Sequence, residues 1–336
     1  MNQTAATRLR GALFFLPAVM LVGCVPTPQD DAIVMKVATV LPQDHPSSQA
    51  LVFFQETLQT LSDGEIDVRL FLNSQLGSTI ETLESCQCGN IEAVFTSVVP
   101  MAQFDPQLNV LCMPFLFRDA EHAYAVLTSP LGMEITAPLA DIGLRNLGYF
   151  NAGTRNIMTT RGPIQRPEDL RGMKIRVMES RLMLQTINAM GALATAMSQG
   201  DVYSALQTGV LDGWENNPPT ALSFRMYETG CRYFAWTRHF LIPDMLIVSD
   251  AFYKRLTPTQ QAWVDQAAEE TVTYQWRLWQ DTNTAIIDEL QAHGMVFNEV
   301  RRELFEVRVQ PLYEQKFEKY GPAFKTIFER IREVQP

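Results

Sequence analysis

Residues 34 to 97 alternate between extended and helical segments, and this alternation constrains the fold more than any other feature of the sequence. Periodicity and turn residues predict five elements: a strand over 34–41, a helix from Ser47 or Ser48 to Leu61, a strand over 66–72, a helix over 78–88 and a strand over 91–97. Such alternation is typical of a parallel α/β sheet. Ligands bind these sheets at the carboxyl ends of the strands, where the sequence places His45 and Glu81.

A second α/β block follows a largely helical region. The predicted elements are helices over 120–128 and 131–142, a strand over 145–150, a strand over 174–178, a helix over 180–190, a strand over 193–196, a helix over 201–208 and a strand over 209–217. The 336 residues suffice for two lobes with separate cores. Because the apolar strand over 245–249 is expected to return to the first block, we predict lobe I over 34–152 plus 242–280 and lobe II over 153–241 plus 281–336.

One very long helix is predicted over residues 258–292. No glycine interrupts this segment, its only proline stands at its first residue, and Gly294 follows its end. At a rise of ~1.5 Å per residue, the helix would be about 50 Å long and could brace both lobes. Its aromatic residues, Trp263, Tyr274, Trp276 and Trp279, are interpreted as core packing rather than as a binding platform.

An arginine stands in the strand that opens the second block. Ile175 and Val177 share one face of this strand, while Lys174, Arg176 and Met178 share the other. Burying an unpaired guanidinium costs several kcal/mol, so Arg176 must either reach solvent at a sheet edge or meet an anion. We hypothesise that Arg176 binds a ligand carboxylate, because its planar donor group matches a carboxylate bidentately. A solvated edge arginine remains the alternative.

Two further positions carry side chains that suit an oxygen-rich ligand. Arg155 follows the small Gly153 and is a candidate second carboxylate donor, with a solvated loop arginine as the alternative. Asn216 ends the strand of GVLDGWENN, where an amide could donate to and accept from hydroxyl groups. The alternative for this asparagine pair is a turn before Pro218.

The N-terminal segment resembles a secretory signal. Arg8 and Arg10 precede an apolar run over 11–22 that is too short to span a membrane permanently. The following Leu21-Val22-Gly23-Cys24 resembles a lipobox, which predicts a signal peptide over 1–23 and lipid on Cys24, with an ordinary signal as the alternative. Residues 24–33 would form a tether, and the mature protein would be extracytoplasmic and lipid-anchored. The remaining cysteines, Cys86, Cys88, Cys112 and Cys231, are expected to be buried thiols, although this compartment permits disulfides.

Several functional classes are disfavoured by the sequence. A net charge of -10 argues against nucleic-acid binding. The four histidines fall in no metal-ligand spacing, so neither a metal nor another cofactor is expected. The chain has no Walker motif, no GxGxxG after a strand, no HExxH and no GxSxG, and no legible nucleophile–base set. We therefore expect ligand capture rather than an enzyme.

Several of these segments together resemble the extracytoplasmic substrate-binding protein of a tripartite ATP-independent periplasmic (TRAP) transporter. They are Gly153-Thr154-Arg155, PEDLRGMKIRV over 167–177, Gly191-Ala192 and VYSALQTGVLDGWENN over 202–217. The resemblance covers essentially the whole mature chain. It implies a periplasmic-binding-protein-like α/β fold in which two lobes close on an organic acid, with the long helix as a scaffold.

The resemblance also implies roles for individual residues. Arg176 would make the principal ionic contact with the ligand carboxylate, Arg155 would be a second donor, and Asn216 would supply an amide. A sugar-acid (uronate-like) subgroup shares Asp44-His45-Pro46, the Asn pair and an acid like Glu81. In that reading His45, Glu81 and Asn216 would address hydroxyl groups. Tyr203 and Trp214 could stack on a sugar face, although Trp214 departs from the small residue usual in the family.

The function implied is capture of a hexuronate or related sugar acid by hinge closure and its delivery to TRAP membrane permease subunits. Three alternatives remain open. The same fold could bind a C4-dicarboxylate, keto acid or aromatic acid, or serve as the sensory partner of a membrane kinase. A secreted enzyme could instead act on acidic sugars with Glu81 or His45 as base.

Overall fold

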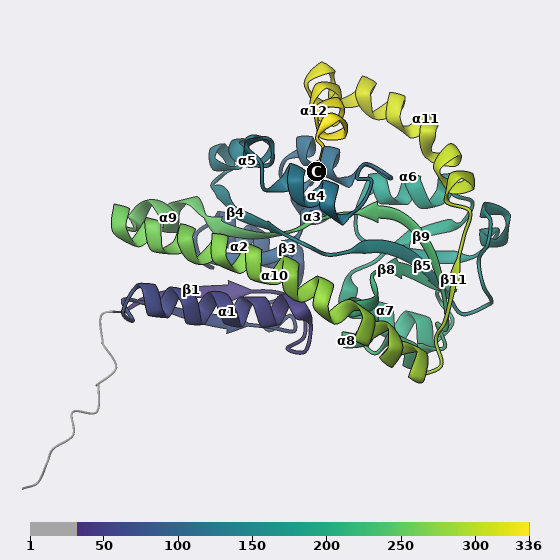
Figure 1. Ribbon diagram of the computed structural model, residues 1–336, viewed down its shortest axis with the longest axis horizontal. Coiled ribbons are helices and arrows are strands. Elements are labelled where there is room, and N and C mark those ends of the chain that lie inside the picture. Colours follow the sequence, from purple (N-terminus) through teal and green to yellow (C-terminus); the bar gives the residue numbers. More distant parts are fainter. Residues whose placement is uncertain (1–31, 336) are drawn as a thin grey trace, which may run out of the picture. The chain divides into compact units, whose positions relative to one another are not determined.

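The computed structural model describes residues 32–335, and its strands form two sheets (Figure 1). In the first sheet, β1 runs parallel to β2 and β3, whereas β10 runs antiparallel to β3 and β4. The pairing of β10 confirms that the chain returns to the first block. In sheet order, its strands are β2 (Ile66–Phe71), β1 (Ile33–Ala38), β3 (Ala93–Ser97), β10 (Asp244–Ser249) and β4 (Leu144–Phe150).

The second sheet contains two strands that the sequence did not predict, β5 and β9. β5 lacks the apolar–polar alternation that usually indicates a strand, because it carries polar side chains such as Arg155 and Asn156. They are buried because a central pairing with β8 and β9 supplies polar partners. In sheet order, the strands are β11 (Val296–Glu299), β9 (Tyr233–Leu241), β5 (Thr154–Thr159), β8 (Gly213–Asn216), β6 (Lys174–Val177) and β7 (Leu193–Ala196).

Helices separate the strands in both sequence blocks, which confirms the predicted α/β class. The α-helices are α1 (Pro46–Leu61), α2 (Thr79–Gln87), α3 (Val98–Met101), α4 (Ala120–Leu127), α5 (Pro130–Thr136), α6 (Arg181–Ala189), α7 (Gln199–Gln207), α8 (Pro218–Ser223), α9 (Asp250–Arg255), α10 (Pro258–Ala292), α11 (Arg302–Tyr320) and α12 (Pro322–Glu333). The 3-10 helices are η1 (Pro106–Cys112), η2 (Ala137–Ile142), η3 (Pro167–Leu170) and η4 (Met226–Thr229).

The first helix begins differently from the prediction. His45, rather than Ser47 or Ser48, caps α1, because its Nδ1 accepts the Ser47 amide at 3.1 Å. Pro46 then occupies the first helical position, where its missing N–H costs no hydrogen bond. The histidine at the end of the first βα loop is therefore held by local backbone chemistry.

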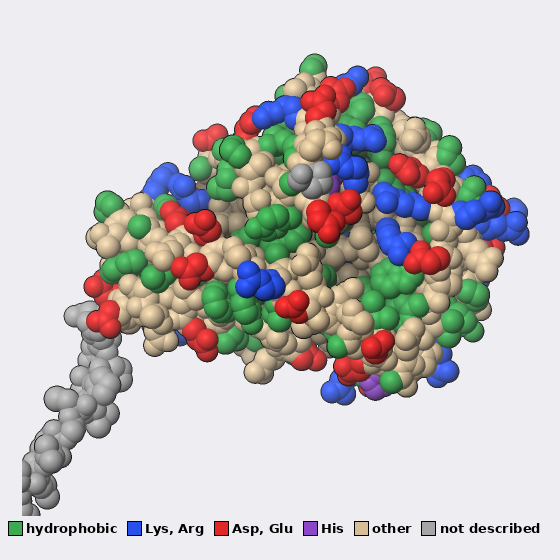
Figure 2. Space-filling model, viewed as in Figure 1, with side chains coloured by type: hydrophobic (Ala, Val, Ile, Leu, Met, Phe, Trp, Pro, Cys, Tyr) green, Lys and Arg blue, Asp and Glu red, His purple; other side chains and the backbone are tan. Residues whose placement is uncertain are grey.

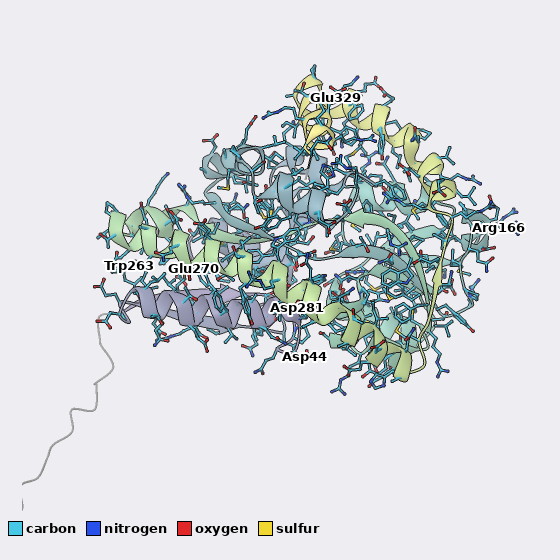
Figure 3. All side chains as sticks on the ribbon, in the orientation of Figure 1. Asp44, Arg166, Trp263, Glu270, Asp281 and Glu329 are labelled. Carbon is cyan, nitrogen blue, oxygen red and sulfur yellow. The ribbon has the colours of Figure 1, made fainter. Side chains whose placement is uncertain are left out.

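The predicted long helix is confirmed over its full length as α10. It contacts α1 and β4 at one part of its length and α8 at another, and it crosses in front of both sheets in Figure 1. Figure 3 labels three points along it, Trp263, Glu270 and Asp281. Trp276 and Trp279 are buried, as predicted for core packing, and the Trp276 indole donates to the Tyr149 carbonyl at 3.1 Å.

The chain crosses directly between the sheets at two neighbouring places. Residues 151–153 join β4 to β5, and residues 242–243 join β9 to β10. The Gln275 side chain of α10 fixes the first crossing, since it accepts the Asn151 amide at 2.8 Å and donates to the Asn151 carbonyl at 2.7 Å. Residues from Ala32 onward form one compact unit, so the lobe boundaries proposed from the sequence remain predictions.

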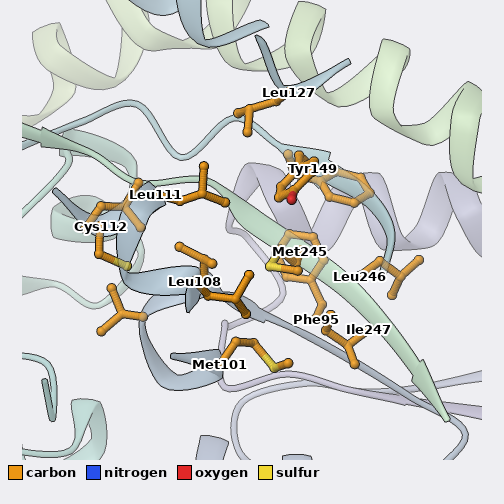
Figure 4. Packing of buried hydrophobic residues seen from close by; sticks show 14 of the residues in the cluster. Phe95, Met101, Leu108, Leu111, Cys112, Leu127, Tyr149, Met245, Leu246 and Ile247 are labelled. Carbon is orange, nitrogen blue, oxygen red and sulfur yellow. The ribbon is translucent and has the colours of Figure 1, made fainter. Parts of the chain in front are cut away.

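A dense apolar core supports the first sheet. Figure 4 shows Leu108, Leu111 and Cys112 of η1 packing near Phe95 of β3 and Met245 of β10. Cys86, Cys112 and Cys231 are buried free thiols, as expected, but Cys88 is exposed at the end of α2. The expectation for Cys88 was wrong because, two residues after Cys86 on the helix, it faces away from the core.

The predicted signal peptide, Cys24 and most of the predicted tether lie outside residues 32–335. Within the described part of the chain, no helix combines the length and the hydropathy that a membrane crossing requires.

Replacing Gly153 by alanine should destabilise the protein more than the same change at Gly172. Both glycines have positive φ, +61° and +75°, so each alanine would carry backbone strain of about 1–2 kcal/mol. Only at Gly153 would the added Cβ also meet a neighbour, at 2.9 Å from the Trp279 indole nitrogen, which adds roughly 1–3 kcal/mol. Urea unfolding of both variants measures the difference, and equal losses would contradict it.

Candidate functional site

A cavity lies where the loops of the first sheet meet those of the second. It has an empty volume of about 860 Å³, its open mouth included. Its walls come from the loop after β1, from β3 and from β10 on one side, and from β5, β6 and β8 on the other. Its ionisable side chains are His45, Arg155, Arg176, Glu179 and Asp244.

Arg176 is a buried cation without a carboxylate partner. Its strand β6 lies between β8 and the edge strand β7, so the solvated-edge alternative is wrong. The side chain is 2% exposed, and its Nε and Nη1 donate to the Met197 carbonyl at 2.8 Å and to the Gln199 Oε1 at 3.1 Å. Both acceptors are neutral, and no acid within residues 32–335 lies within 4 Å of it. Burial lowers the pKa of Arg176 to about 10, so it remains charged at neutral pH.

Arg155 also lines the cavity, but a resident acid already balances its charge. Its Nε donates to the Glu215 Oε2 at 2.6 Å, and its Nη2 donates to Oε1 at 2.8 Å and to the Glu215 carbonyl at 3.0 Å. Burial alone would raise the pKa of Glu215, but the charge and hydrogen bonds of Arg155, together with those of the neighbouring His239, outweigh burial and lower the pKa. The ion pair therefore needs no ligand to neutralise it, and a carboxylate-binding role for Arg155 stays a prediction.

The Asn pair divides between the cavity and the backbone. Asn217 caps α8, since its Oδ1 accepts the Thr220 amide at 2.8 Å, and its Nδ2 donates to the Ala152 carbonyl at 2.9 Å. The turn-forming interpretation therefore describes Asn217. The Oδ1 of Asn216 accepts the Asn217 amide at 3.0 Å, while its Nδ2 donates to no residue within 32–335. Asn216 lines the cavity with this amide group available.

His45 lies in the cavity wall with both ring nitrogens engaged. Its Nδ1 accepts the Ser47 amide, so the neutral ring carries its proton on Nε2, which lies 3.3 Å from the Thr220 hydroxyl. Burial lowers the pKa of His45 to about 3, which keeps the ring neutral. The predicted contact of His45 with ligand hydroxyl groups would require one of these two hydrogen bonds to break.

Two hydrogen bonds join the opposing walls of the cavity. One is the contact of His45, before α1, with Thr220 of α8. The other runs from the Gln103 Nε2, beyond α3, to the Glu179 carbonyl, beyond β6, at 3.0 Å. These bonds lie between segments that follow strands of the first sheet and segments that follow strands of the second, so they connect the two walls of the cavity.

Three of the predicted site residues do not reach the cavity. The Glu81 Oε2 accepts the amide and hydroxyl of Ser78, both at 2.8 Å, and completes the capping box of α2. The Tyr203 hydroxyl donates to the Glu228 Oε2 at 2.9 Å on the surface. Trp214 is fully buried in the apolar cluster of the second sheet. Helix capping, a surface hydrogen bond and core packing use these side chains, so their contact with a ligand stays a prediction.

The sequence reasoning missed Gln199 and Asp244. Gln199 opens α7 and holds Arg176, and only the fold brings the two together. Asp244 opens β10, and within residues 32–335 its carboxylate accepts no hydrogen bond from a side chain or an amide. Burial raises its pKa to about 7, although the Arg155 charge opposes the rise. The sequence could have pointed to Asp244, because this acid stands directly before the apolar run MLIVS.

The molecular surface carries both signs of charge. On the face shown in Figure 2, acidic and basic side chains are interspersed. No group of three His, Cys, Asp or Glu side chains that could hold a metal ion was found in the described part of the chain. The arrangement instead combines one unpaired cation, amide groups and one unpaired acid, which suits an anionic, hydroxylated small molecule.

Comparison with known proteins agrees with this site. Residues 37–320 match the DctP model, described as bacterial extracellular solute-binding protein, family 7. A solute-binding protein of Chromohalobacter salexigens is 30% identical over 88% of this chain and 87% of its own length. Two solved TRAP periplasmic solute-binding proteins share the fold. That of Xanthobacter autotrophicus Py2, with bound β-D-galacturonate, is 33% identical with a TM-score of 0.86 and covers 90% of this chain and 100% of its own. That of Sulfitobacter sp. NAS-14.1, also with bound β-D-galacturonate, is 31% identical with a TM-score of 0.86 and the same coverage.

The family match spans most of the chain, and the solved relatives share its two-lobe periplasmic-binding-protein fold. The chain therefore belongs to family 7 of the bacterial extracellular solute-binding proteins, the DctP family, and is a substrate-binding protein of a TRAP transporter.

Proposed function

We propose that this protein captures a hexuronate, or a closely related sugar acid, in the cavity between its two sheets. The observation that carries the proposal is the buried guanidinium of Arg176, which has no acid partner among the described residues. A monocarboxylate would supply the missing negative charge through a bidentate contact. The bound galacturonate of two solved relatives at 31% and 33% identity supports a uronate as this acid.

The remaining cavity groups would address the hydroxyl groups of the sugar. The Asn216 amide is free to donate, and Asp244 can accept. In this proposal Arg155 acts mainly through its ion pair with Glu215, which keeps a rigid polar wall beside the ligand. Arg155 could still offer its unused Nη1 to the ligand carboxylate.

Binding would shift an equilibrium between open and closed forms. The two crossings at 151–153 and 242–243 are the short links about which the sheets would rotate, and α10 would brace the motion. A ligand that touches both walls binds the closed form more tightly and so favours it. The closed protein would then deliver the acid to the membrane permease subunits of the transporter.

We also propose that the extracytoplasmic protein is lipid-anchored at Cys24. The supporting observation is the sequence Leu21-Val22-Gly23-Cys24 after an apolar run. Replacing Cys24 by serine should remove the site of lipid addition and move most of the protein from the membrane fraction to the soluble extracytoplasmic fraction. Fractionation followed by immunoblotting measures this change. An unchanged distribution would contradict the anchor and leave the ligand proposal intact.

A ligand panel tests the proposed function. D-Glucuronate and D-galacturonate should raise the thermal midpoint of the protein, whereas succinate, pyruvate and benzoate should not. Released ligand should be chemically unchanged, as a binding protein requires and a secreted enzyme acting on uronates does not. Stabilisation by succinate alone would replace the proposal with a C4-dicarboxylate function.

Arg176→Ala should weaken uronate binding by roughly 100-fold or more, because the ligand carboxylate would lose its buried charge partner. Arg176→Lys should retain the charge but lose the bidentate geometry, with a loss of about tenfold or more. Arg171→Lys, at an exposed turn before the same strand, is the matched control and should bind normally. Isothermal titration calorimetry measures all three, and full affinity in Arg176→Ala would refute the carboxylate assignment.

A further inference from the structure

The cavity contains one unpaired acid as well as one unpaired cation. Asp244 opens β10 directly after the crossing at 242–243, and it pairs with Ser97 of β3 and Phe150 of β4 in the first sheet. Arg176 belongs to the second sheet, between β7 and β8. The two charges therefore approach the cavity from different sheets, and no ion pair within residues 32–335 joins them.

The charge balance of the cavity follows from its five ionisable groups. His45 is neutral, and Arg155 is neutralised by Glu215. Glu179 is exposed beside the cavity, and its charge, after that of Glu215, raises the pKa of Arg176 against the effect of burial. Only Arg176 and Asp244 remain as buried or half-buried charges without a partner. A guest with one carboxylate neutralises Arg176, whereas a second carboxylate would find no cation free of an acid partner, because Glu215 already balances the charge of Arg155.

We propose that Asp244 is the specificity-determining residue that accepts a ligand hydroxyl group and excludes a second carboxylate. This inference rests on the proposed function and deepens it, because it assigns the cavity to hydroxylated monocarboxylates and excludes dicarboxylates. A hydroxyl group can donate to the Asp244 carboxylate, whereas a ligand carboxylate at the same place meets a like charge in a poorly hydrated cavity. Rejection by an unpaired like charge is a direct means of discrimination.

The discrimination should depend on pH. The pKa of Asp244 is raised to about 7, so its carboxylate loses most of its charge between pH 8 and pH 6. Over the same interval His45, with a pKa of about 3, stays neutral, and Arg176, with a pKa of about 10, stays charged. Ligand carboxylates also remain ionised. A dicarboxylate should therefore bind the wild-type protein better at pH 6 than at pH 8.

D-Glucuronate and D-glucarate are suitable probes, because glucarate carries a second carboxylate in place of the C1 aldehyde group. Calorimetry on the full-length protein should give tighter binding of glucuronate than of glucarate at pH 8. In Asp244→Asn, the ratio of the two dissociation constants should fall by about tenfold or more, and the pH dependence of glucarate binding should disappear. Asp244→Ser provides a second neutral variant. Asp281→Asn is the matched control and should behave as wild type, because Asp281 is an exposed acid on α10, labelled in Figure 3, that does not line the cavity.

Unfolding of the ligand-free variants reports whether they are intact. A raised folded-state pKa means that the unfolded chain releases its proton first, so wild-type stability falls as pH rises from about 4 to 7. Asp244→Asn lacks this loss, so it should be more stable than wild type above pH 7 and equal to it near pH 4.

The outcomes separate the two proposals. If wild type binds neither uronate, the proposed function fails, and this inference fails with it. If wild type binds glucuronate but Asp244→Asn and Asp244→Ser leave the ratio unchanged, only the inference about Asp244 is overturned. Equal weakening of both ligands also overturns it, because Asp244 would then support the cavity without sensing charge.

Discussion

The buried guanidinium of Arg176 is the interaction on which the site depends. Neutral acceptors from Met197 and Gln199 hold its position without cancelling its charge. A nearby acid is present, but Glu215 is committed to Arg155 through a bidentate contact. An unpaired buried charge is unfavourable, so an anionic ligand that pairs with Arg176 would relieve this cost. A protein with a net charge of -10 thus presents one local cation to anionic solutes.

Sequence reasoning recovered the elements whose signals are local. The limits of α10 follow from Pro258 and from the glycine after its end, and Arg176 stood out because a cation interrupts an apolar strand. β5 was missed because its polar side chains find partners only after distant strands pair. The ligand contacts predicted for Glu81, Tyr203 and Trp214 remain predictions. Their types suit a sugar site, but a helix cap, a surface hydrogen bond and a core already use them.

Two short chain segments cross between the sheets, and side chains of α10 pack against the first of them. Gln275 of α10 binds the backbone amide and carbonyl of Asn151. Trp279 packs so closely against Gly153 that a side chain at this position would have no room for its Cβ. Arg155 and Asp244 lie just beyond the two crossings, one on each sheet. Charges that face the ligand are therefore coupled by short stretches of backbone to the links that set the angle between the sheets.

The two hydrogen bonds between the walls of the cavity, from His45 to Thr220 and from Gln103 to Glu179, have a kinetic consequence if the lobes must open before a solute enters. Both bonds would then have to break before the solute reaches Arg176. Once solute is abundant, the rate of capture would level off at the frequency of opening instead of rising with concentration. Release would require the same opening, and a long residence time could then accompany an only moderate equilibrium affinity.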